Sequence, residues 1–457
     1  MSIDPSLAHL ITDPPETPAS LLRLTTAEAD RYPVLWEAEV AVVGGGSAGC
    51  AAAVASARHG AATILIEAGG FFGGTAAAVL DTMYGFFPAG SQQRIVGGIG
   101  WEVAKSLLDS REAMLRGNTY GAGTGVTYEP EALKFEWDRR IVEAGVRPLL
   151  HARMESVIMD GDTVRGLVVL TRRGPFQIRT PRIIDASGDA NVAWAAGCSL
   201  EMPSAQRRVQ PLTTTFRLGG VGEPVKTPEL HRLMREADAS GDYRLPRLEG
   251  SAHPTMLAGV YHTNVTRISG IDATNPWAAT AAEIEGRKQA TEYTRFFHDR
   301  VPGYENSYLL NTSVWAGTRE TRRLLGEYVL TKEDVLEARQ FDDAIGLCGA
   351  PIEDHDGGAS TIWRYVAAAE DGEPTGRSYG IPYRCLVPKD VEGLLVAGRC
   401  LSATHDAHAS ARSIAQCLSY GHAAGAAAAL ATSSGTSLRG IDIDTLRTQL
   451  SEDGVIL

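Results

Sequence analysis

The sequence predicts an α/β protein in which a Rossmann-type parallel sheet is interrupted by an inserted α+β domain. Three observations lead to this prediction. A glycine-rich turn joins a buried strand to a helix near residue 44, and two more apolar strands follow at 182–186 and 393–397. The long stretch between those two strands is more polar and aromatic than either of them. We therefore expect one sheet built from both ends of the chain, with a second domain between its parts.

Local composition predicts the first strand–helix–strand unit. Residues 39–43 form an apolar run that leads into three glycines, which is typical of a buried strand in a parallel sheet. Residues 47–59 are rich in alanine, the strongest helix former, and Gly60 stands where a helix commonly ends. Residues 62–67 repeat the buried-strand pattern. Residues 39–67 are thus a complete βαβ unit.

Later elements are predicted by the same signals. We expect helices at 130–144, 279–300, 319–329 and 410–431, antiparallel strands at 157–171 and 176–180, and apolar strands at 182–186 and 393–397. The predicted layout is an N-terminal extension at 1–36, a cofactor-binding domain in two parts at 37–202 and 384–435, a substrate or cap domain at 203–383, and a C-terminal tail at 436–457.

Composition excludes several classes of function. The chain has 457 residues, and 43 Lys and Arg against 55 Asp and Glu give a net charge of −12. No basic stripe is present to bind a phosphate backbone, so we expect no nucleic-acid partner. The six cysteines lack the clustered spacing of metal or iron–sulfur ligands, which predicts no metal site and reduced thiols. No signal peptide or membrane-spanning run is evident, so we expect a cytoplasmic protein, with homo-oligomer formation left open.

The turn after the first strand carries a dinucleotide-binding fingerprint. Gly44, Gly46 and Gly49 have the spacing GxGxxG, and Glu67 ends the second strand. The first glycine permits a tight turn, the second lets the backbone approach a pyrophosphate, and the third lets the helix pack on the sheet. The helix N-terminus offers free N–H groups to the phosphates, and the acid can accept hydrogen bonds from a ribose. A glycine turn without a ligand is the plainer alternative.

Three further segments favour FAD over NAD as the dinucleotide. A second glycine loop, at 69–75, follows Glu67 directly. Asp189 follows the strand at 182–186 and can reach ribityl hydroxyls, and Gly398 and Arg399 follow the strand at 393–397. Each segment alone is compatible with an ordinary strand-end turn, but their order along the chain matches an extended flavin nucleotide.

These motifs resemble the FAD-dependent oxidoreductases of the glutathione-reductase-like superfamily. The resemblance covers about residues 33–430, and its more specific marks are GTRETRRLLGEYVLTKEDV and the stretch around SATHDAHASARS. It implies non-covalent FAD and a small-molecule substrate. The residues expected to bind FAD are Gly44, Gly46, Ser47, Ala48, Gly49, Glu67, Ala68, Gly73, Gly74, Thr75, Gly98, Asp189, Gly398, Arg399, Ser410 and Ile414. The chain departs from the family pattern at Ala409, Ile414 and Ala415, so the resemblance does not identify the substrate.

Two histidines are candidates for the base that removes a proton from the substrate. His405 follows the predicted flavin-binding loop, and an imidazole accepts a proton near neutral pH. His355 lies beside Asp354 and Asp356, either of which can fix its tautomer. The alternatives are a structural hydrogen bond for His405 and a solvated acidic turn around His355. A metal bound by His405 and His408 lacks a third ligand at a sensible spacing.

Arg319 is the candidate for binding a substrate carboxylate, because a guanidinium binds a carboxylate through two hydrogen bonds. Arg322 and Arg323 have the same chemistry, but the neighbouring acids Glu320 and Glu327 make ion pairs an alternative for this segment. Tyr261, His262 and Asn264 in the inserted region are candidate substrate contacts.

The resulting prediction is a flavoenzyme that oxidises a small polar or aromatic substrate by two electrons, with hydride transfer to flavin N5. A redox-neutral flavoenzyme (isomerase, hydratase or lyase) and a flavin-containing electron-carrier subunit remain open alternatives. The sequence does not identify the substrate or the electron acceptor.

Overall fold

A computed structural model describes residues 3–117, 121–203, 209–355 and 361–457. Its central sheet is parallel, with the strand order β23-β12-β3-β4-β8. These strands are β3 (Val40–Val43), β4 (Thr63–Ile66), β8 (Arg147–Leu149), β12 (Ile183–Asp185) and β23 (Leu394–Val396). β12 lies between β3 and β23, so the two ends of the chain meet in one sheet. The predicted Rossmann-type α/β fold is confirmed.

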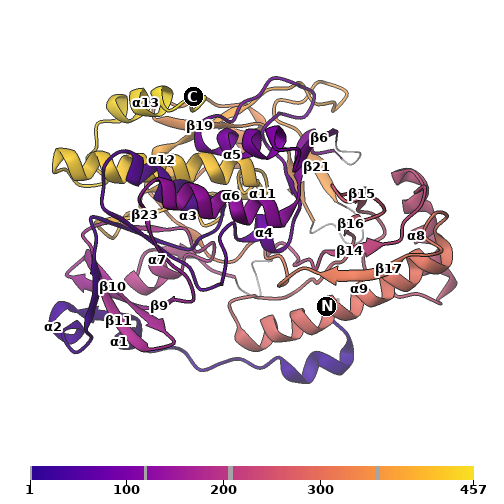
Figure 1. The fold of residues 1–457 in the computed structure, drawn as a ribbon, viewed down its shortest axis with the longest axis horizontal. Helices are drawn as coiled ribbons and strands as arrows, with labels where there is room; N and C mark the ends of the chain where they lie inside the picture. The colour runs from indigo at the N-terminus through magenta and orange to yellow at the C-terminus, as the bar shows by residue number, and fades with distance from the viewer. Residues whose placement is uncertain (1–2, 118–120, 204–208, 356–360) are drawn as a thin grey trace.

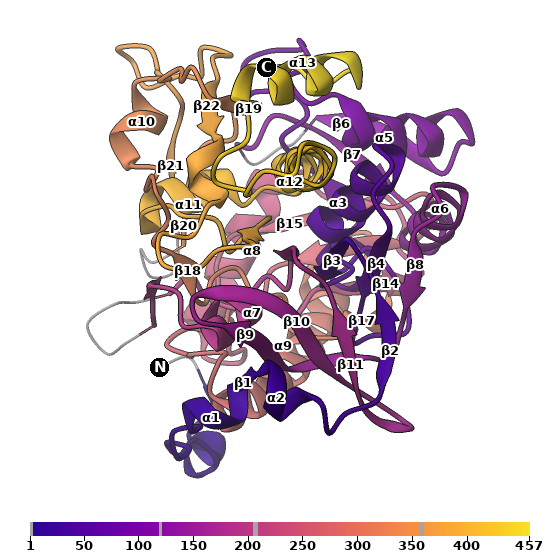
Figure 2. The same ribbon diagram turned by 90° about the vertical axis from the view of Figure 1, so that its left-hand side faces the viewer.

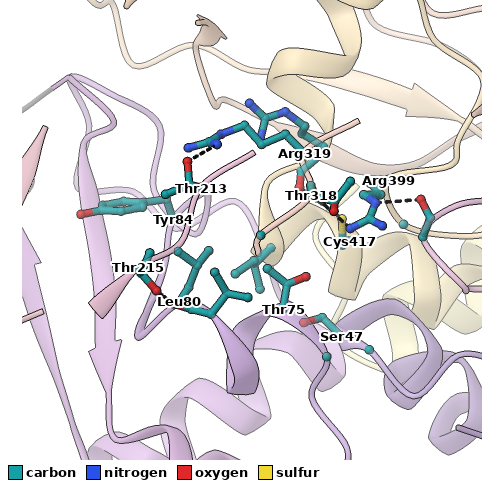
Figure 3. Close-up of a pocket in the computed structure, with 18 of the residues that line it drawn as sticks. Ser47, Thr75, Leu80, Tyr84, Thr213, Thr215, Thr318, Arg319, Arg399 and Cys417 are labelled. Atoms are coloured by element: carbon teal, nitrogen blue, oxygen red, sulfur yellow. Dashed lines mark hydrogen bonds between the residues drawn. The ribbon is translucent and has the colours of Figure 1, made fainter. Parts of the chain in front are cut away.

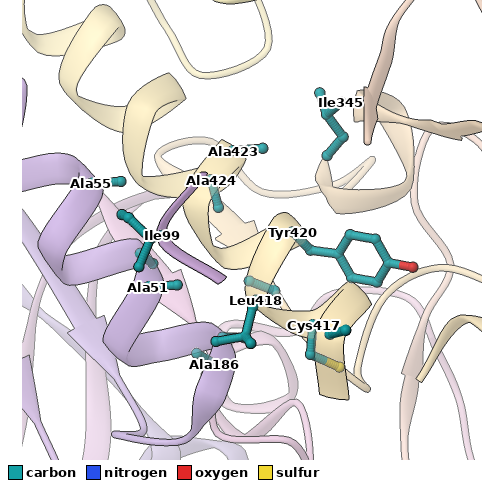
Figure 4. Packing of buried hydrophobic residues seen from close by; sticks show 14 of the residues in the cluster. Ala51, Ala55, Ile99, Ala186, Ile345, Cys417, Leu418, Tyr420, Ala423 and Ala424 are labelled. Carbon is teal, nitrogen blue, oxygen red and sulfur yellow. The ribbon is translucent and has the colours of Figure 1, made fainter. Parts of the chain in front are cut away.

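Two helices pack against each other over this sheet. α3 (Ser47–Arg58) follows β3, and α12 (Ile414–Ser434) lies along it, as Figure 4 shows from close by. Glycines on α12 allow the contact, because a Cβ added at Gly421 would lie 2.0 Å from the carbonyl oxygen of Ala48 and one at Gly425 would lie 2.1 Å from that of Ala52. The small side chains predicted for both helices therefore permit close packing of the two backbones.

Further helices and a small sheet complete this part of the molecule. They are α4 (Thr75–Ala78), α5 (Gly98–Asp109), α6 (Pro130–Glu143), α7 (Asn191–Ala196), α11 (His405–Ala411), α13 (Ile443–Glu452), and the small sheet β5-β7-β6 of β5 (Thr82–Met83), β7 (Thr124–Tyr128) and β6 (Ala113–Gly117). The predicted C-terminal tail is folded. Its helix α13 packs on α12, and the N–H of Gly98 donates to the carbonyl of Gly454.

A second sheet has the order β1-β9-β10-β11-β2. It consists of β9 (Arg153–Asp160), β10 (Thr163–Thr171) and β11 (Gly174–Arg179), with β1 (Arg23–Thr25) and β2 (Val34–Glu37) added in parallel at its edges. Figure 2 shows β1 and β2 on either side of the three longer strands. The predicted N-terminal extension thus supplies both edge strands. The same N-terminal segment contains three short helices. η1 (Pro5–Leu10) and α1 (Ala19–Leu22) precede β1, and α2 (Thr26–Ala29) follows it.

The central region of the chain forms a separate antiparallel sheet, β15-β16-β14-β17. Its strands are β14 (Phe216–Gly219), β15 (Ser251–Pro254), β16 (Tyr261–Asn264) and β17 (Tyr308–Thr312), and its helices are α8 (Thr227–Ser240) and the long α9 (Pro276–Arg300). Figure 1 shows this unit on the right, away from α3 and α12. Phe216, Tyr293, Phe296 and Phe297 belong to a hydrophobic core of its own.

The rest of the central region joins the two units. It contains β13 (Leu200–Glu201), β18 (Arg323–Leu324), α10 (Lys332–Leu336), β19 (Ala344–Cys348), β20 (Ile352–Asp354), β21 (Ile362–Arg364), β22 (Tyr379–Pro382) and η2 (Tyr383–Leu386). β19 packs against α12, although the sequence places its residues in the inserted domain. None of the helices in the described ranges is both long and apolar enough to cross a membrane.

Two helix predictions are wrong. Residues 319–329 are not helical, because Leu324, Leu325 and Glu327 donate their N–H groups to Cys400, Ser199 and Val387, and β18 pairs with β13. The helix predicted at 410–431 is split into α11 and α12 by a break at 412–413. The tertiary hydrogen bonds prevail over helix propensity in the first case. The other predicted helices and strands are present, with ends shifted by up to about four residues.

Candidate active site

A cavity of about 480 Å³ extends from the glycine turn after β3 to the sheet of the inserted unit. Figure 3 shows its lining, with Ser47, Thr75 and Arg399 toward one end and Tyr84 and Thr215 toward the other. Both parts of the predicted cofactor-binding domain line it, through the loops after β3, β12 and β23. The inserted region contributes residues of β15, β16, β20 and β21, and of the segments before β14, before β15 and after β17. One cavity therefore joins the predicted nucleotide site to the predicted substrate domain.

The glycine turn and the start of α3 form the wall at the first end. Gly44, Gly46, Ser47 and Ala48 line the cavity, and α3 has no side-chain cap, so its first N–H groups are left for a ligand. A Cβ at Gly44 would lie 2.4 Å from the carbonyl oxygen of Ala186, whereas one at Gly46 would meet nothing nearer than 3.9 Å. Gly44 is thus needed for packing, and Gly46 keeps the backbone open toward the cavity.

Glu67 stands at the end of β4 and also lines the cavity. Its carboxylate accepts hydrogen bonds from the N–H groups of Gly45 and Gly69, both at 2.6 Å. These bonds fix the carboxylate between the two glycine loops. The side chain is therefore held in one orientation beside the N-terminus of α3, as the dinucleotide fingerprint requires.

Asp189 and Arg399 form an ion pair at the carboxyl ends of β12 and β23. The guanidinium of Arg399 lies 2.6 Å from Oδ1 of Asp189 and also donates to the carbonyls of Gly188 and Thr318. The hydroxyl of Thr321 donates to the same Oδ1. Both charged residues line the cavity. This ion pair joins the loops that follow two neighbouring strands, which come from the two separate parts of the chain.

The N-terminus of α12 reaches the cavity at Ile414, and this helix also lacks a side-chain cap. Ser410, in contrast, is fully buried in α11, where its hydroxyl donates to the carbonyl of Ala350 and bonds the hydroxyl of Tyr379. Because the chain breaks between α11 and α12, the helix N-terminus that faces the cavity is at Ile414, whereas the sequence predicted it at Ser410.

The structure separates the predicted cofactor residues into two groups. Those that line the cavity are Gly44, Gly46, Ser47, Ala48, Glu67, Gly74, Thr75, Asp189, Gly398, Arg399 and Ile414. Those that are not part of its lining are Gly49, Ala68, Gly73, Gly98 and Ser410. Gly49 supports the turn, because a Cβ there would lie 1.7 Å from the carbonyl oxygen of Gly44. Gly98 begins α5 and packs against His422.

Three arginines line the cavity on the side of the inserted region: Arg247, Arg319 and Arg412. Arg319 donates to the carbonyl of Pro211 and to the hydroxyl of Thr213, a bond drawn in Figure 3. Burial, together with the like charge of Arg412, lowers the pKa of Arg319 to about 9. Nε and Nη2 of Arg412 are buried without a hydrogen-bond partner. Glu353 lines the cavity near them, and His355 and the arginines hold its pKa well below the usual value despite its burial.

The two histidines predicted as bases do not line this cavity. His405 begins α11, and its Nδ1 lies 2.9 Å from Oε2 of Glu320, which raises the pKa of His405. His355 is buried, with Nε2 3.0 Å from Oε1 of Glu353 and Nδ1 bonded to the hydroxyl of Thr361. Asp356, its other predicted partner, lies outside the described residues. Both imidazoles hold cavity-facing segments in place without facing the cavity themselves.

Sequence reasoning missed Asp81 and His253, which line the cavity together with His262. Asp81 precedes β5, whereas His253 and His262 lie opposite each other on β15 and β16. His262 and Asn264, both proposed from the sequence as substrate contacts, do line the cavity, whereas Tyr261 does not. The alternation of strand residues puts 262 and 264 on the same face, which is a signal that the sequence offers. Nothing local connects Asp81 to that face.

A comparison with curated protein sequences finds no match. Similar solved structures include a geranylgeranyl bacteriochlorophyll reductase-like protein from Thermoplasma acidophilum, which is 13% identical with a TM-score of 0.45 and matches over 91% of this chain and 82% of its own. Another is a p-nitrophenol 4-monooxygenase from Pseudomonas putida, which is 11% identical with a TM-score of 0.47 and matches over 91% and 86%.

A family match covers most of the chain and identifies the cofactor. The family described as FAD dependent oxidoreductase matches residues 39–450, which include the glycine turn, the inserted region and α12. The predicted resemblance is thereby confirmed, and so is the predicted use of FAD. This chain belongs to the FAD-dependent oxidoreductase family and is an FAD-dependent enzyme.

Proposed function

We propose that this enzyme oxidises, by two electrons, a small polar or aromatic organic substrate that carries a carboxylate or a similar anionic group. The single observation that carries this proposal is the group of three cavity-lining arginines, one of which has two buried guanidinium nitrogens without a hydrogen-bond partner. Bound FAD would supply the acceptor for the two electrons and the proton of such a substrate, which would leave it as a hydride. The residues of the chain hold the cofactor and orient the substrate against it.

The residues at the first end of the cavity fit FAD. The uncapped N-terminus of α3 supplies N–H groups for a pyrophosphate, and Gly46 leaves open space in front of them. Glu67 offers carboxylate oxygens to a ribose, and Asp189 offers its carboxylate further along the cavity. The uncapped N-terminus of α12 at Ile414 carries a partial positive charge, which favours the anionic reduced form of a flavin.

The arginine group favours an anionic substrate. Arg247 donates a hydrogen bond to the side chain of Asn264. Arg319 donates to the carbonyl of Pro211 and to the hydroxyl of Thr213. These bonds hold both guanidiniums in fixed positions. Arg412 has Nε and Nη2 buried without a partner, which is costly for a charged group unless a ligand supplies acceptors. A carboxylate is the group that a guanidinium binds best, through two parallel hydrogen bonds. Glu353 and Asp81 are the carboxylates that line this side of the cavity, and the three arginines outnumber them.

Aromatic side chains at the same end limit the shape of the substrate. Tyr84 and Trp363 line the cavity, and the hydroxyl of Tyr84 accepts a hydrogen bond from Arg116 at 2.9 Å. Flat aromatic surfaces exclude water and pack against a planar or apolar part of a ligand. A polar molecule with an aromatic or planar body and an acidic group therefore fits best.

The test is an anaerobic mixing experiment with the FAD-loaded enzyme. A panel of small hydroxy, amino and aromatic carboxylic acids is mixed with it, each next to its neutral amide. Lasting bleaching of the flavin absorbance by an acid but not by its amide supports the proposal. Turnover without bleaching supports a redox-neutral reaction instead, and bleaching by the amides alone contradicts the anionic substrate.

The matched variant is Arg412→Gln, with Arg232→Gln as its control. Removing a charged hydrogen-bond donor costs about 1.5–3 kcal/mol, so KM for the acid rises roughly 10- to 150-fold in R412Q. Arg232 lies on α8, where it pairs with Glu229 and Glu236 away from the cavity, so R232Q keeps the wild-type KM. Equal KM values for R412Q and R232Q would exclude Arg412 from substrate binding.

A further inference from the structure

Asp81, His253 and His262 form a buried cluster in the wall of the cavity. Their exposed fractions are 1%, 7% and 4%. Nε2 of His253 lies 2.9 Å from Oδ1 of Asp81, and Nδ1 of His262 lies 3.5 Å from the same oxygen. Each residue has one nitrogen or oxygen atom able to ligate a metal ion, and these three atoms lie within 4.8 Å of one another. The cluster is separate from the arginine group and from the residues that fit FAD.

The tautomer of His262 leaves a lone pair directed at a carboxylate. Nε2 of His262 lies 3.2 Å from the carbonyl oxygen of Val79, and a carbonyl only accepts hydrogen bonds, so this nitrogen carries the proton. Nδ1 of the neutral ring is then an acceptor, and it has no hydrogen-bond partner. This nitrogen lies 3.5 Å from Oδ1 of Asp81. Oδ2 of the same carboxylate is also buried without a hydrogen-bond partner. Two buried acceptors facing each other repel unless a cation or a donor lies between them.

The cation that acts on the cluster already has a partner. Arg217 lies near Asp81 and forms an ion pair with Glu129 at 3.1 Å. Its charge is therefore compensated by Glu129, which leaves the carboxylate of Asp81 available to a bound cation.

We propose that Asp81, His253 and His262 bind a divalent transition-metal ion, of which Zn²⁺ is the simplest example. Two imidazoles and one carboxylate are a common ligand set for such ions. Ligands about 2.0–2.2 Å from a tetrahedral Zn²⁺ lie on the order of 3.4 Å apart, and the two separations from Asp81, 2.9 and 3.5 Å, lie on either side of that value.

Hydrogen bonds to the proposed ligands, and their access to the cavity, support the same assignment. The bond from His262 to the carbonyl of Val79 is the kind of contact that orients metal-bound histidines. The hydroxyl of Thr82 donates to Oδ1 of Asp81 at 3.1 Å. All three proposed ligands line the cavity, so a substrate or water oxygen can complete the coordination. An ion held there polarises such an oxygen and lowers its pKa.

The experiment titrates the FAD-loaded protein with metal alone. The protein is treated with a chelator, dialysed, and titrated with Zn²⁺ by calorimetry. We expect one ion per chain. Asp81→Asn and His262→Asn remove one ligand each. Loss of a residue that only hydrogen-bonds a metal ligand already weakens metal binding by about 10- to 100-fold. We therefore expect the affinity for Zn²⁺ to fall on the order of 100-fold in each variant.

The control is Asp453→Asn, which changes a carboxylate that also contacts two histidines but lies elsewhere. Asp453 contacts His59 and His422, and none of the three lines the cavity. D453N should bind Zn²⁺ as the wild type does. Failure of the wild-type protein to bind Zn²⁺, or unchanged affinity in both D81N and H262N, would overturn the proposal. So would an equal loss of affinity in D453N.

A second measurement covers variants that do not fold. X-ray absorption by the Zn²⁺-loaded wild-type protein should show imidazole nitrogens among the ligands and no sulfur. A shell of oxygens alone, as expected for an ion held by the FAD phosphates, would contradict the assignment. This readout depends neither on enzymatic activity nor on the identity of the substrate.

Discussion

Two clusters of one aspartate and two histidines occur in the described part of the molecule, and they differ in how completely their hydrogen bonds are made. At Asp453, Nε2 of His59 and Nε2 of His422 lie 2.7 and 2.8 Å from the same Oδ2. Nδ1 of His422 accepts the N–H of Ile99 at 3.3 Å, so its Nε2 carries the proton toward the carboxylate. Asp453 follows α13 and is thereby joined to α12 and to the end of α3.

The cluster at Asp81 has the same composition and keeps one such contact, between Nε2 of His253 and Oδ1 of Asp81 at 2.9 Å, but its second histidine is oriented differently. Nδ1 of His262 faces the carboxylate as a lone pair, and Oδ2 of Asp81 has no partner. The Asp453 cluster therefore stabilises the fold by itself, whereas the Asp81 cluster is completed only by something that binds to it. Residue type alone does not distinguish a structural contact from a binding site. The position of the proton on each imidazole does.

Zn²⁺ should have the largest effect on stability, and only through the Asp81 cluster. A ligand that binds only the folded state stabilises it by about 4.1 kcal/mol at 1,000 times its Kd. We expect this gain in the wild type and in D453N. In D81N a 100-fold weaker affinity puts the same Zn²⁺ concentration at about ten times its Kd, so we expect a gain of only about 1.4 kcal/mol. Urea unfolding of the FAD-loaded proteins with and without Zn²⁺ measures it. An equal gain in D81N would mean that the ion binds elsewhere.

Asp453→Asn should destabilise the metal-free protein by about 1.5–3 kcal/mol. The substitution replaces a charged acceptor shared by two imidazoles with a neutral amide, and the side chain of His422 is only 3% exposed. The midpoint of urea unfolding measures the loss, with Asp444→Asn on the same C-terminal segment as the control. A stability equal to that of the wild type would show that the contact of α13 with α12 does not depend on Asp453.

The contribution of Asp453 should depend on pH. Burial opposes its ionisation, but the hydrogen bonds from His422 and His59 outweigh burial and lower the pKa to about 2. A carboxyl group whose pKa is lower in the folded than in the unfolded protein stabilises the fold fully above its unfolded pKa of about 3.9, and less as the pH falls through the folded value. The difference in stability between wild type and D453N should therefore shrink between pH 4 and pH 2. A constant difference would contradict this origin.

Asp81→Asn should have the smallest effect in the absence of metal. The amide of Asn can donate to Nδ1 of His262, the lone pair that Asp81 leaves unpartnered. We expect a change of less than about 1 kcal/mol, because the new hydrogen bond to His262 offsets the loss of the charge that Nε2 of His253 contacts. Urea unfolding in the presence of a chelator measures it. A loss as large as that in D453N would show that the two clusters play the same structural role.

The sequence predicts much of the nucleotide end of the cavity. Gly44, Gly46 and Glu67 belong to one continuous unit, and their roles follow from strand and helix patterns within about thirty residues. The roles proposed for His405 and His355 came from motif likeness and nearby acids. The structure pairs His405 with Glu320 and His355 with Glu353, and neither histidine lines the cavity. Adjacency in sequence did not reveal which way these side chains point.

What the sequence alone determined is the Rossmann-type fold, the FAD family and the glycine turn, because short-range periodicity and backbone freedom at glycine are local properties. The tertiary structure alone decided which charged groups meet in the cavity. Asp81 and His253 are 172 residues apart, and they meet because the strand pair β15–β16 packs over the segment before β5. No local pattern records such a contact, since it depends on how two separately formed units pack together.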